Sequence, residues 1–302
     1  MLNQRFGIEL EYNSFSEKSE ENQLPLGMLE VAEVLMVALN KTINISKWHT
    51  TSDNDSWIVK PDSSCGFEVC SPIFKSENDL KELKDAIKAI RKSGIFKSDR
   101  KCSFHVHFEL NNTSNNYLAN LIVSWIRCEL FFFTLLPNYR KQTNYAQILS
   151  LCPLFFCKND SDNILLTEEM IINNIKDYKF YSINLYHFKK SNRNTVEFRI
   201  MDSSACLNEE YAFYYIVLLN KFMEECNSKN YFLDSVLDNS YLEWLEVQDV
   251  FDFLKIKKNS KIYNFCKTRF YNYSLDNVDL NMSSLKNIFN IYNDSVKKYF
   301  EK

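Results

Sequence analysis

Hydrophobic and polar residues alternate in several short segments of the chain, and this two-residue period is typical of half-buried β-strands. In residues 5–12, for example, Ile8 and Leu10 alternate with acidic residues. The same period, or a short apolar run between turn residues, predicts further strands at 57–60, 66–71, 102–110, 181–188 and 195–202. Turns at 61–65 and 189–194 would join two pairs of these strands into hairpins.

Apolar residues with helical spacing lie between and after these strands. The predicted helices span residues 26–40, 77–92, 114–136, 208–226, 241–253 and 283–299. Ser76 is suited to cap the N-terminus of the second helix, and Gly94 is suited to end it. Because hairpins outnumber βαβ units, we expect an α+β fold with a mainly antiparallel sheet flanked by helices. Residues 1–230 would form one domain, and residues 231–302 a helical C-terminal extension packed on the same domain.

Composition narrows the class of protein. The chain has 302 residues, of which 45% are hydrophobic, so it can bury a large core. The net charge is −3 and no basic tract is present, which argues against a nucleic-acid partner. The N-terminus has no apolar signal segment, and the longest apolar run, near 130–137, is short for a membrane span. Nine cysteines without a CxxC pair indicate reduced, mostly buried thiols. We therefore expect a soluble cytoplasmic protein with no membrane partner.

Charged and imidazole side chains recur at positions i and i+2 of the predicted strands, where they point to one face of the sheet. They are Glu9 and Glu11, Glu68, His105 and His107, and Glu197 and Arg199. If the strands adjoin, carboxylates crowded on this face would repel one another unless cations neutralise them. Oxygen ligands suit Mg²⁺ or Mn²⁺, and a guanidinium suits phosphate. The chain has four glycines and no glycine-rich phosphate loop, so metals and side chains would have to hold any nucleotide.

Each motif also has a simpler interpretation. One acidic pair alone would be a solvated strand face, and Glu197 with Arg199 would be an ion pair. The two histidines would be one core and one surface residue, or part of a zinc site with Cys102 and either Cys65 or Cys70. Arg140 follows a helix end and would serve equally well as a C-terminal cap.

The motifs, taken in order, resemble the amidoligase family, a branch of the superfamily that includes glutamine synthetase and glutamate–cysteine ligase. The resemblance runs from residue 5 to about 226 and rests on the segments 6–11, 57–63, 66–72, 105–107, 137–140, 181–185 and 195–199. The chain departs from the family pattern in three places. Cys102 and Ser103 stand where a glycine is expected before the histidines, Lys179 stands in place of an arginine, and Met201–Ser204 replaces a Gly-Thr ending.

The resemblance implies an enzyme with a glutamine-synthetase-like sheet that joins a carboxylate to an amine through an acyl phosphate. Its implied cofactors are ATP and Mg²⁺ or Mn²⁺, and its substrates are small-molecule or peptide carboxylates and amines. The implied ligands of one metal are Glu9, His105 and Glu197, and those of the other are Glu11 and Glu68. The implied catalytic residues are Arg199, Arg140 and Glu68. The implied nucleotide and substrate contacts are Arg199, His107 and Asn184.

Two other functions are compatible with these residues. One is a metal- or peptide-binding module that keeps the fold without ligating, and the other is a zinc-dependent hydrolase that uses the histidine pair. Members of the superfamily often assemble into rings or dimers, so a homo-oligomer is compatible with the resemblance, although the residues do not fix a number of subunits.

Overall fold

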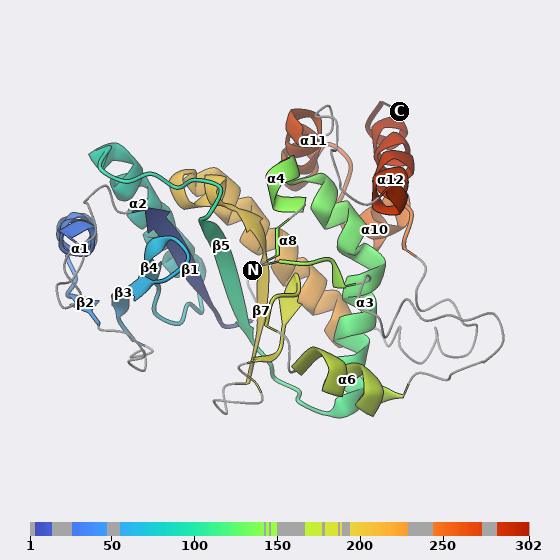
Figure 1. Cartoon of the computed structure of the whole chain (residues 1–302), viewed down its shortest axis with the longest axis horizontal. Helices are drawn as coiled ribbons and strands as arrows, with labels where there is room; N and C mark the ends of the chain where they lie inside the picture. Colours follow the sequence, from blue (N-terminus) through green and yellow to red (C-terminus); the bar gives the residue numbers. More distant parts are fainter. Residues whose placement is uncertain are drawn as a thin grey trace. The chain divides into compact units, whose positions relative to one another are not determined.

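The computed structural model describes residues 4–13, 26–46, 55–141, 143–144, 146–149, 167–176, 179–186, 188, 194–228, 244–273 and 283–301 (Figure 1). The chain divides into two compact units. The first contains residues 1–109 and 200–217, and the second contains residues 110–199 and 218–302. The expected boundary near residue 230 stays a prediction.

Five strands form the sheet of the first unit. They are β1 (Phe6–Asn13), β2 (Ile43–Ile45), β3 (Trp57–Asp62), β4 (Gly66–Cys70) and β5 (Ser103–Glu109). Their order is β2-β3-β4-β1-β5, so the N-terminal strand lies between β4 and β5. The pairs β3–β4, β4–β1 and β1–β5 are antiparallel, and β2 pairs with β3 in parallel.

One face of this sheet forms the core of the first unit. Leu10, Val69 and Val106 are fully buried there, as the alternation of their strands predicts. The helices of this unit are α1 (Leu26–Leu39), α2 (Glu77–Ser93) and the 3₁₀ helix η2 (Ser203–Leu207). The Trp57 indole donates to Glu82 of α2 over 2.8 Å, and the Tyr12 hydroxyl donates to the carbonyl of Cys206 over 2.7 Å. The other face of the sheet is thereby left for polar residues.

Helix α2 begins and ends as the sequence predicts. Ser76 accepts from the backbone N–H of Asp79, and Asp79 accepts from the N–H of Ser76 in return, which completes a capping box. Gly94 has a φ of 66°, the left-handed conformation that favours glycine after a helix.

The second unit is mostly helical. Its helices are α3 (Asn115–Thr134), α4 (Asn138–Lys141), α6 (Glu168–Lys176), α10 (Val247–Phe253), α11 (Lys261–Tyr273) and α12 (Ser283–Glu301), and it shares α8 (Glu209–Ser228) with the first unit. Strand β6 (Ile183–Asn184) pairs antiparallel with β7 (Thr195–Asp202), whose last three residues count with the first unit.

Trp125 of α3 lies at the centre of the second unit's core. Its ring packs edge-on against Phe198 and Phe222, at centroid distances of 5.0 and 5.3 Å. Its indole N–H donates to the Ser182 hydroxyl over 2.8 Å. Among the described helices, α3 alone is long and apolar enough to cross a membrane, but 94% of its most apolar window is buried within the protein. Such burial is typical of a core helix, although α3 exceeds the short apolar run noted in the sequence.

The expected mixed fold with mostly antiparallel strands is confirmed. The glutamine-synthetase-like type of sheet stays a prediction. Strand β6 has two residues instead of the expected run over 181–188, because the Asn184 side chain accepts from the N–H of Tyr186 and turns the chain. The hydrophobic pattern did not predict β2, α4, α6 or η2, and it predicted a helical region but no separate helix where α11 lies. The seven described cysteines are free and buried, as expected.

Candidate functional site

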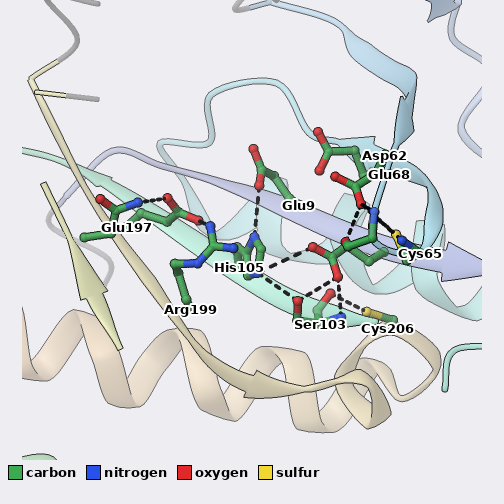
Figure 2. A network of polar contacts seen from close by, with 12 residues as sticks. Glu9, Asp62, Cys65, Glu68, Ser103, His105, Glu197, Arg199 and Cys206 are labelled. Carbon is green, nitrogen blue, oxygen red and sulfur yellow. Dashed lines mark hydrogen bonds and ion pairs between the residues drawn. The ribbon is translucent and has the colours of Figure 1, made fainter. Parts of the chain in front are cut away.

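The polar face of the first unit's sheet brings five of the predicted site residues together. Antiparallel register places Glu9 opposite His105 and Glu11 opposite Glu68, and it places His107 opposite a glycine. Glu9, Glu68 and His105 are labelled in Figure 2, which shows their side chains on one side of the strands. We call Glu9, Glu11, Glu68 and His105 the carboxylate site.

His105 connects two of the carboxylates. The residue is 1% exposed, with Nδ1 3.0 Å from Glu9 Oε2 and Nε2 2.8 Å from Ser103 Oγ. The N–H and the hydroxyl of Ser103 both donate to Glu11 Oε2, each over 2.7 Å. A continuous hydrogen-bonded path therefore runs from Glu9 through His105 and Ser103 to Glu11. The first three of these residues are labelled in Figure 2.

Glu9 also lies beside the second histidine, with 3.4 Å between Glu9 Oε1 and His107 Nε2. Burial disfavours the ionised carboxylate of Glu9. The charge of His107 and hydrogen bonds from both imidazoles outweigh that effect, so the pKa of Glu9 lies well below its usual range. Glu9 is therefore ionised at neutral pH and can bind a cation.

Glu68 lies in a different electrostatic environment. Burial and the neighbouring charge of Glu9 raise the pKa of Glu68 to about 8, although the ammonium of Lys60 lies only 2.6 Å from its Oε1. Burial lowers the pKa of Lys60, but the charge of Glu9, followed by those of Cys70 and Glu68, raises it above its ordinary value. Glu68 therefore has both a like charge, that of Glu9, and an opposite charge, that of Lys60, beside it.

Ligand atoms of Glu9, Glu68 and Cys70 all lie within 4.8 Å of one another. Two carboxylates suit a hard cation such as Mg²⁺ or Mn²⁺. Burial, then the charges of Glu68 and Glu9, raise the pKa of the Cys70 thiol and disfavour the thiolate that zinc prefers. The donor set therefore fits the metals implied by the resemblance. Cys102 lies outside it, with its Sγ 3.8 Å from Asp99 Oδ1.

The remaining predicted residues form a second cluster, in the second unit. Arg199 forms an ion pair with Glu197, two residues away on β7 (Figure 2), and Asn184 donates to Glu197 Oε2 over 2.7 Å. Arg140 is 2% exposed and donates to the backbone carbonyl of Arg199. The ion pair that was the simpler interpretation is therefore present. A metal shared by Glu197 and Glu9 stays a prediction.

Sequence reasoning missed Lys60 and Ser103. A signal for Lys60 was available, because a hairpin in which Asp62 pairs with Gly66 also pairs Lys60 with Glu68. The turn itself is formed by Asp62, whose Oδ1 accepts from the N–H groups of Ser64 and Cys65 over 2.7 and 3.2 Å. Ser103 gave no signal, because its role depends on the pairing of two strands that are distant in sequence.

Comparison with known proteins gives one family. The model of the family described as "Putative amidoligase enzyme" matches residues 2–223. Among solved structures, a bifunctional glutathione synthetase from Pasteurella multocida is similar with a TM-score of 0.41 and 9% sequence identity. That similarity covers 90% of this chain and 47% of the synthetase, so the chain spans about half the length of that protein. No curated protein matches the sequence.

Proposed function

The chain belongs to the amidoligase family, and we propose that it is an ATP-dependent ligase that joins a carboxylate to an amine through an acyl phosphate. Its substrates would be a small-molecule or peptide carboxylate and an amine. The observation that carries the proposal is the carboxylate site, where three acidic residues and an imidazole lie on one sheet face of the first unit.

This site is suited to metal-bound nucleotide. A bare triphosphate would be repelled by three carboxylates, whereas carboxylates that share divalent cations with phosphate oxygens are a common way to hold ATP. Glu9 and Glu68 have donor atoms close enough to share an ion, and Glu11 and His105 border them. When bound, Mg²⁺ would neutralise charge on the transferred phosphoryl group.

Residues around the site keep these ligands in place. Ser103 fixes one oxygen of Glu11 with two hydrogen bonds, and it lies against the ring of His105. The other ring nitrogen of His105 lies against Glu9, so the imidazole cannot turn without losing both neighbours. Side chains oriented in this way need little reorganisation when a ligand binds.

The second cluster would act on the transferred group. Arg199 has a side chain that is 16% exposed, and its guanidinium would stabilise charge that develops on the phosphoryl oxygens. Arg140 donates to the carbonyl of Arg199, so we assign it the role of positioning β7. Asn184, oriented by Glu197, would bind substrate or phosphate.

The reaction has two steps. In the first, a substrate carboxylate oxygen attacks the γ-phosphorus of ATP, the bond to the bridging oxygen breaks, and ADP leaves. In the second, a neutral amine attacks the acyl carbon, phosphate leaves, and the amine loses a proton. The acyl phosphate supplies the good leaving group that a free carboxylate lacks, and catalysis would come mainly from positioning and charge neutralisation.

Hydroxylamine can test this reaction before the natural amine is known, because it traps acyl phosphates as hydroxamates. The wild-type chain would be incubated with Mg-ATP, hydroxylamine and a panel of amino acids and peptides. The proposal predicts that one carboxylate yields hydroxamate and ADP in equal amounts, and that Glu9→Gln abolishes both. Hydroxamate formed without ATP would contradict the proposal and indicate an acyl transferase or hydrolase.

A zinc-dependent hydrolase that uses the histidine pair is the second candidate, because His105 and His107 both lie beside the carboxylate of Glu9. Elemental analysis of the purified protein distinguishes the two. Stoichiometric zinc together with activity that needs no ATP would favour the hydrolase.

A further inference from the structure

Lys60 lies in the same cross-strand row as two residues of the carboxylate site. It pairs with Glu68 across β3 and β4, and Glu68 pairs with Glu11 across β4 and β1. The ammonium of Lys60 lies 2.6 Å from Glu68 Oε1, and the lysine side chain is 28% exposed. This is a largely buried ion pair at the site.

Each of the three carboxylates has neighbours within the chain, but only Glu68 is paired with an ammonium. Glu68 has the ammonium of Lys60, and Glu11 has the N–H and the hydroxyl of Ser103. These are the two residues to which the family resemblance assigns the second metal ion. Glu9 lies against the imidazoles of His105 and His107, and Glu11 Oε1 also lies 3.6 Å from His105 Nε2. Imidazole is a common metal ligand, whereas the ammonium of Lys60 can only donate to Glu68.

An ammonium so close to a carboxylate competes with a divalent ion for the same oxygen. Both cations neutralise the carboxylate. The ammonium is covalently attached to the chain, however, so its local concentration does not depend on the metal concentration in solution. A divalent ion that displaced it would leave a poorly solvated ammonium near the metal, and like charges at that distance repel.

We propose that Lys60 is a built-in cation that fills one of the cation positions of the carboxylate site. The first unit's carboxylate site then takes one divalent ion where its carboxylates alone would take two. This inference rests on the metal site of the proposed function and deepens it. Lys60 acts here as a positioning residue, because it neutralises and orients Glu68 and transfers nothing itself.

A second consequence concerns the protein without metal. Because the ammonium of Lys60 stays beside Glu68 when metal is removed, it offsets part of the negative charge that Glu9 and Glu68 would otherwise place on the sheet. Chelation should therefore lower the thermal midpoint of a Lys60→Met variant more than that of the wild type.

The test is the number of Mn²⁺ ions that the full chain binds, measured by equilibrium dialysis and by the electron paramagnetic resonance signal of free Mn²⁺. Lys60→Met removes the charge and keeps the length of the side chain, whereas Lys60→Arg keeps the charge. Lys41→Met is the matched control, because Lys41 forms an ion pair of the same length, 2.6 Å, with Glu82 in the same unit. Circular dichroism melts would show that each variant is folded, and Lys60→Gln would replace Lys60→Met if the latter were not.

The expected result is about one Mn²⁺ per chain for the wild type, Lys60→Arg and Lys41→Met, and about two for Lys60→Met. About two ions in the wild type, or one ion with unchanged affinity in Lys60→Met, would overturn the role of Lys60 and leave the metal-dependent ligase standing. Absence of Mn²⁺ from every variant, with and without ATP, would overturn both proposals.

Discussion

Ser103 and Glu11 are joined by two hydrogen bonds to one carboxylate oxygen, each 2.7 Å long, across strands whose residues lie about ninety positions apart in the chain. The serine hydroxyl that donates to Glu11 also lies 2.8 Å from the ring of His105. One small side chain therefore orients two of the proposed ligands.

Ser103→Ala should weaken Mg-ATP binding and destabilise the fold. Glu11 would keep the backbone donor and lose the hydroxyl, and His105 Nε2 would lose its neighbour. The loss of such buried hydrogen bonds should lower the free energy of unfolding by about 1–3 kcal/mol, measured by urea denaturation. Ser93→Ala is the control, since its hydroxyl donates to a carbonyl at the end of α2. Equal losses in the two variants would contradict the role of Ser103.

Addition of Mg²⁺ should raise the thermal midpoint of the wild-type chain, because a cation relieves repulsion between Glu9 and Glu68. At a concentration of about 100 times Kd, binding adds about 2.7 kcal/mol to the free energy of unfolding. Differential scanning calorimetry with and without chelator measures the shift. The shift should disappear in Glu9→Gln, and a shift of undiminished size in that variant would exclude Glu9 as a ligand.

Replacement of Arg199 should affect mainly the rate of the reaction, and replacement of Arg140 mainly the stability of the fold. Arg199→Ala should lower kcat for hydroxamate formation by about 10²-fold, because its guanidinium would act on the transferred group. Arg140→Ala removes a buried donor to the carbonyl of Arg199, so the free energy of unfolding should fall by about 1–3 kcal/mol. Similar stability losses in both variants, with kcat unchanged in Arg199→Ala, would reverse these assignments.

The capping box of α2 should make part of the stability depend on pH. Burial disfavours the charged form of Asp79, but hydrogen bonds from the N–H groups of Lys75 and Ser76 prevail and lower its pKa. The stabilisation is therefore complete above the unfolded-state pKa of Asp79 and is lost as the pH falls through the lower folded-state value. In Asp79→Asn the free energy of unfolding should therefore decrease less steeply as the pH falls through the acidic range. Urea denaturation at a series of pH values measures this dependence. The same slope of the free energy of unfolding against acidic pH in the wild type and the variant would contradict this prediction.

Local features of the fold followed from the sequence more readily than distant pairings. Ser76 and Gly94 defined both ends of α2, and alternation located β1, β5 and β7 to within a residue or two. The three residues of β2 were too few to show a period. The prediction for β6 was too long, because no change in the hydrophobic pattern marks the turn at Asn184.

The sequence predicted which side chains of the site share a face of their strand. It did not predict which side chains on different strands contact one another. Glu9, Glu11 and the histidines were recognised from i, i+2 spacing, which fixes direction on a strand. Which strand lies beside which is decided by tertiary packing. For that reason the pairing of Glu11 with Ser103 could not be foreseen, whereas that of Lys60 with Glu68 was implicit in a short hairpin.

The central claim is that the carboxylate site binds ATP through a divalent metal, and isothermal titration calorimetry of Mg-ATP tests it most directly. The wild-type chain would be compared with Glu9→Gln and with Glu109→Gln, which alters an exposed carboxylate of β5 paired with Arg5. The account predicts binding that requires Mg²⁺, that is unchanged in Glu109→Gln and that is weakened by at least about tenfold in Glu9→Gln, a loss of about 1.4 kcal/mol. Equal binding by all three proteins, or binding that persists without a divalent ion, would contradict it.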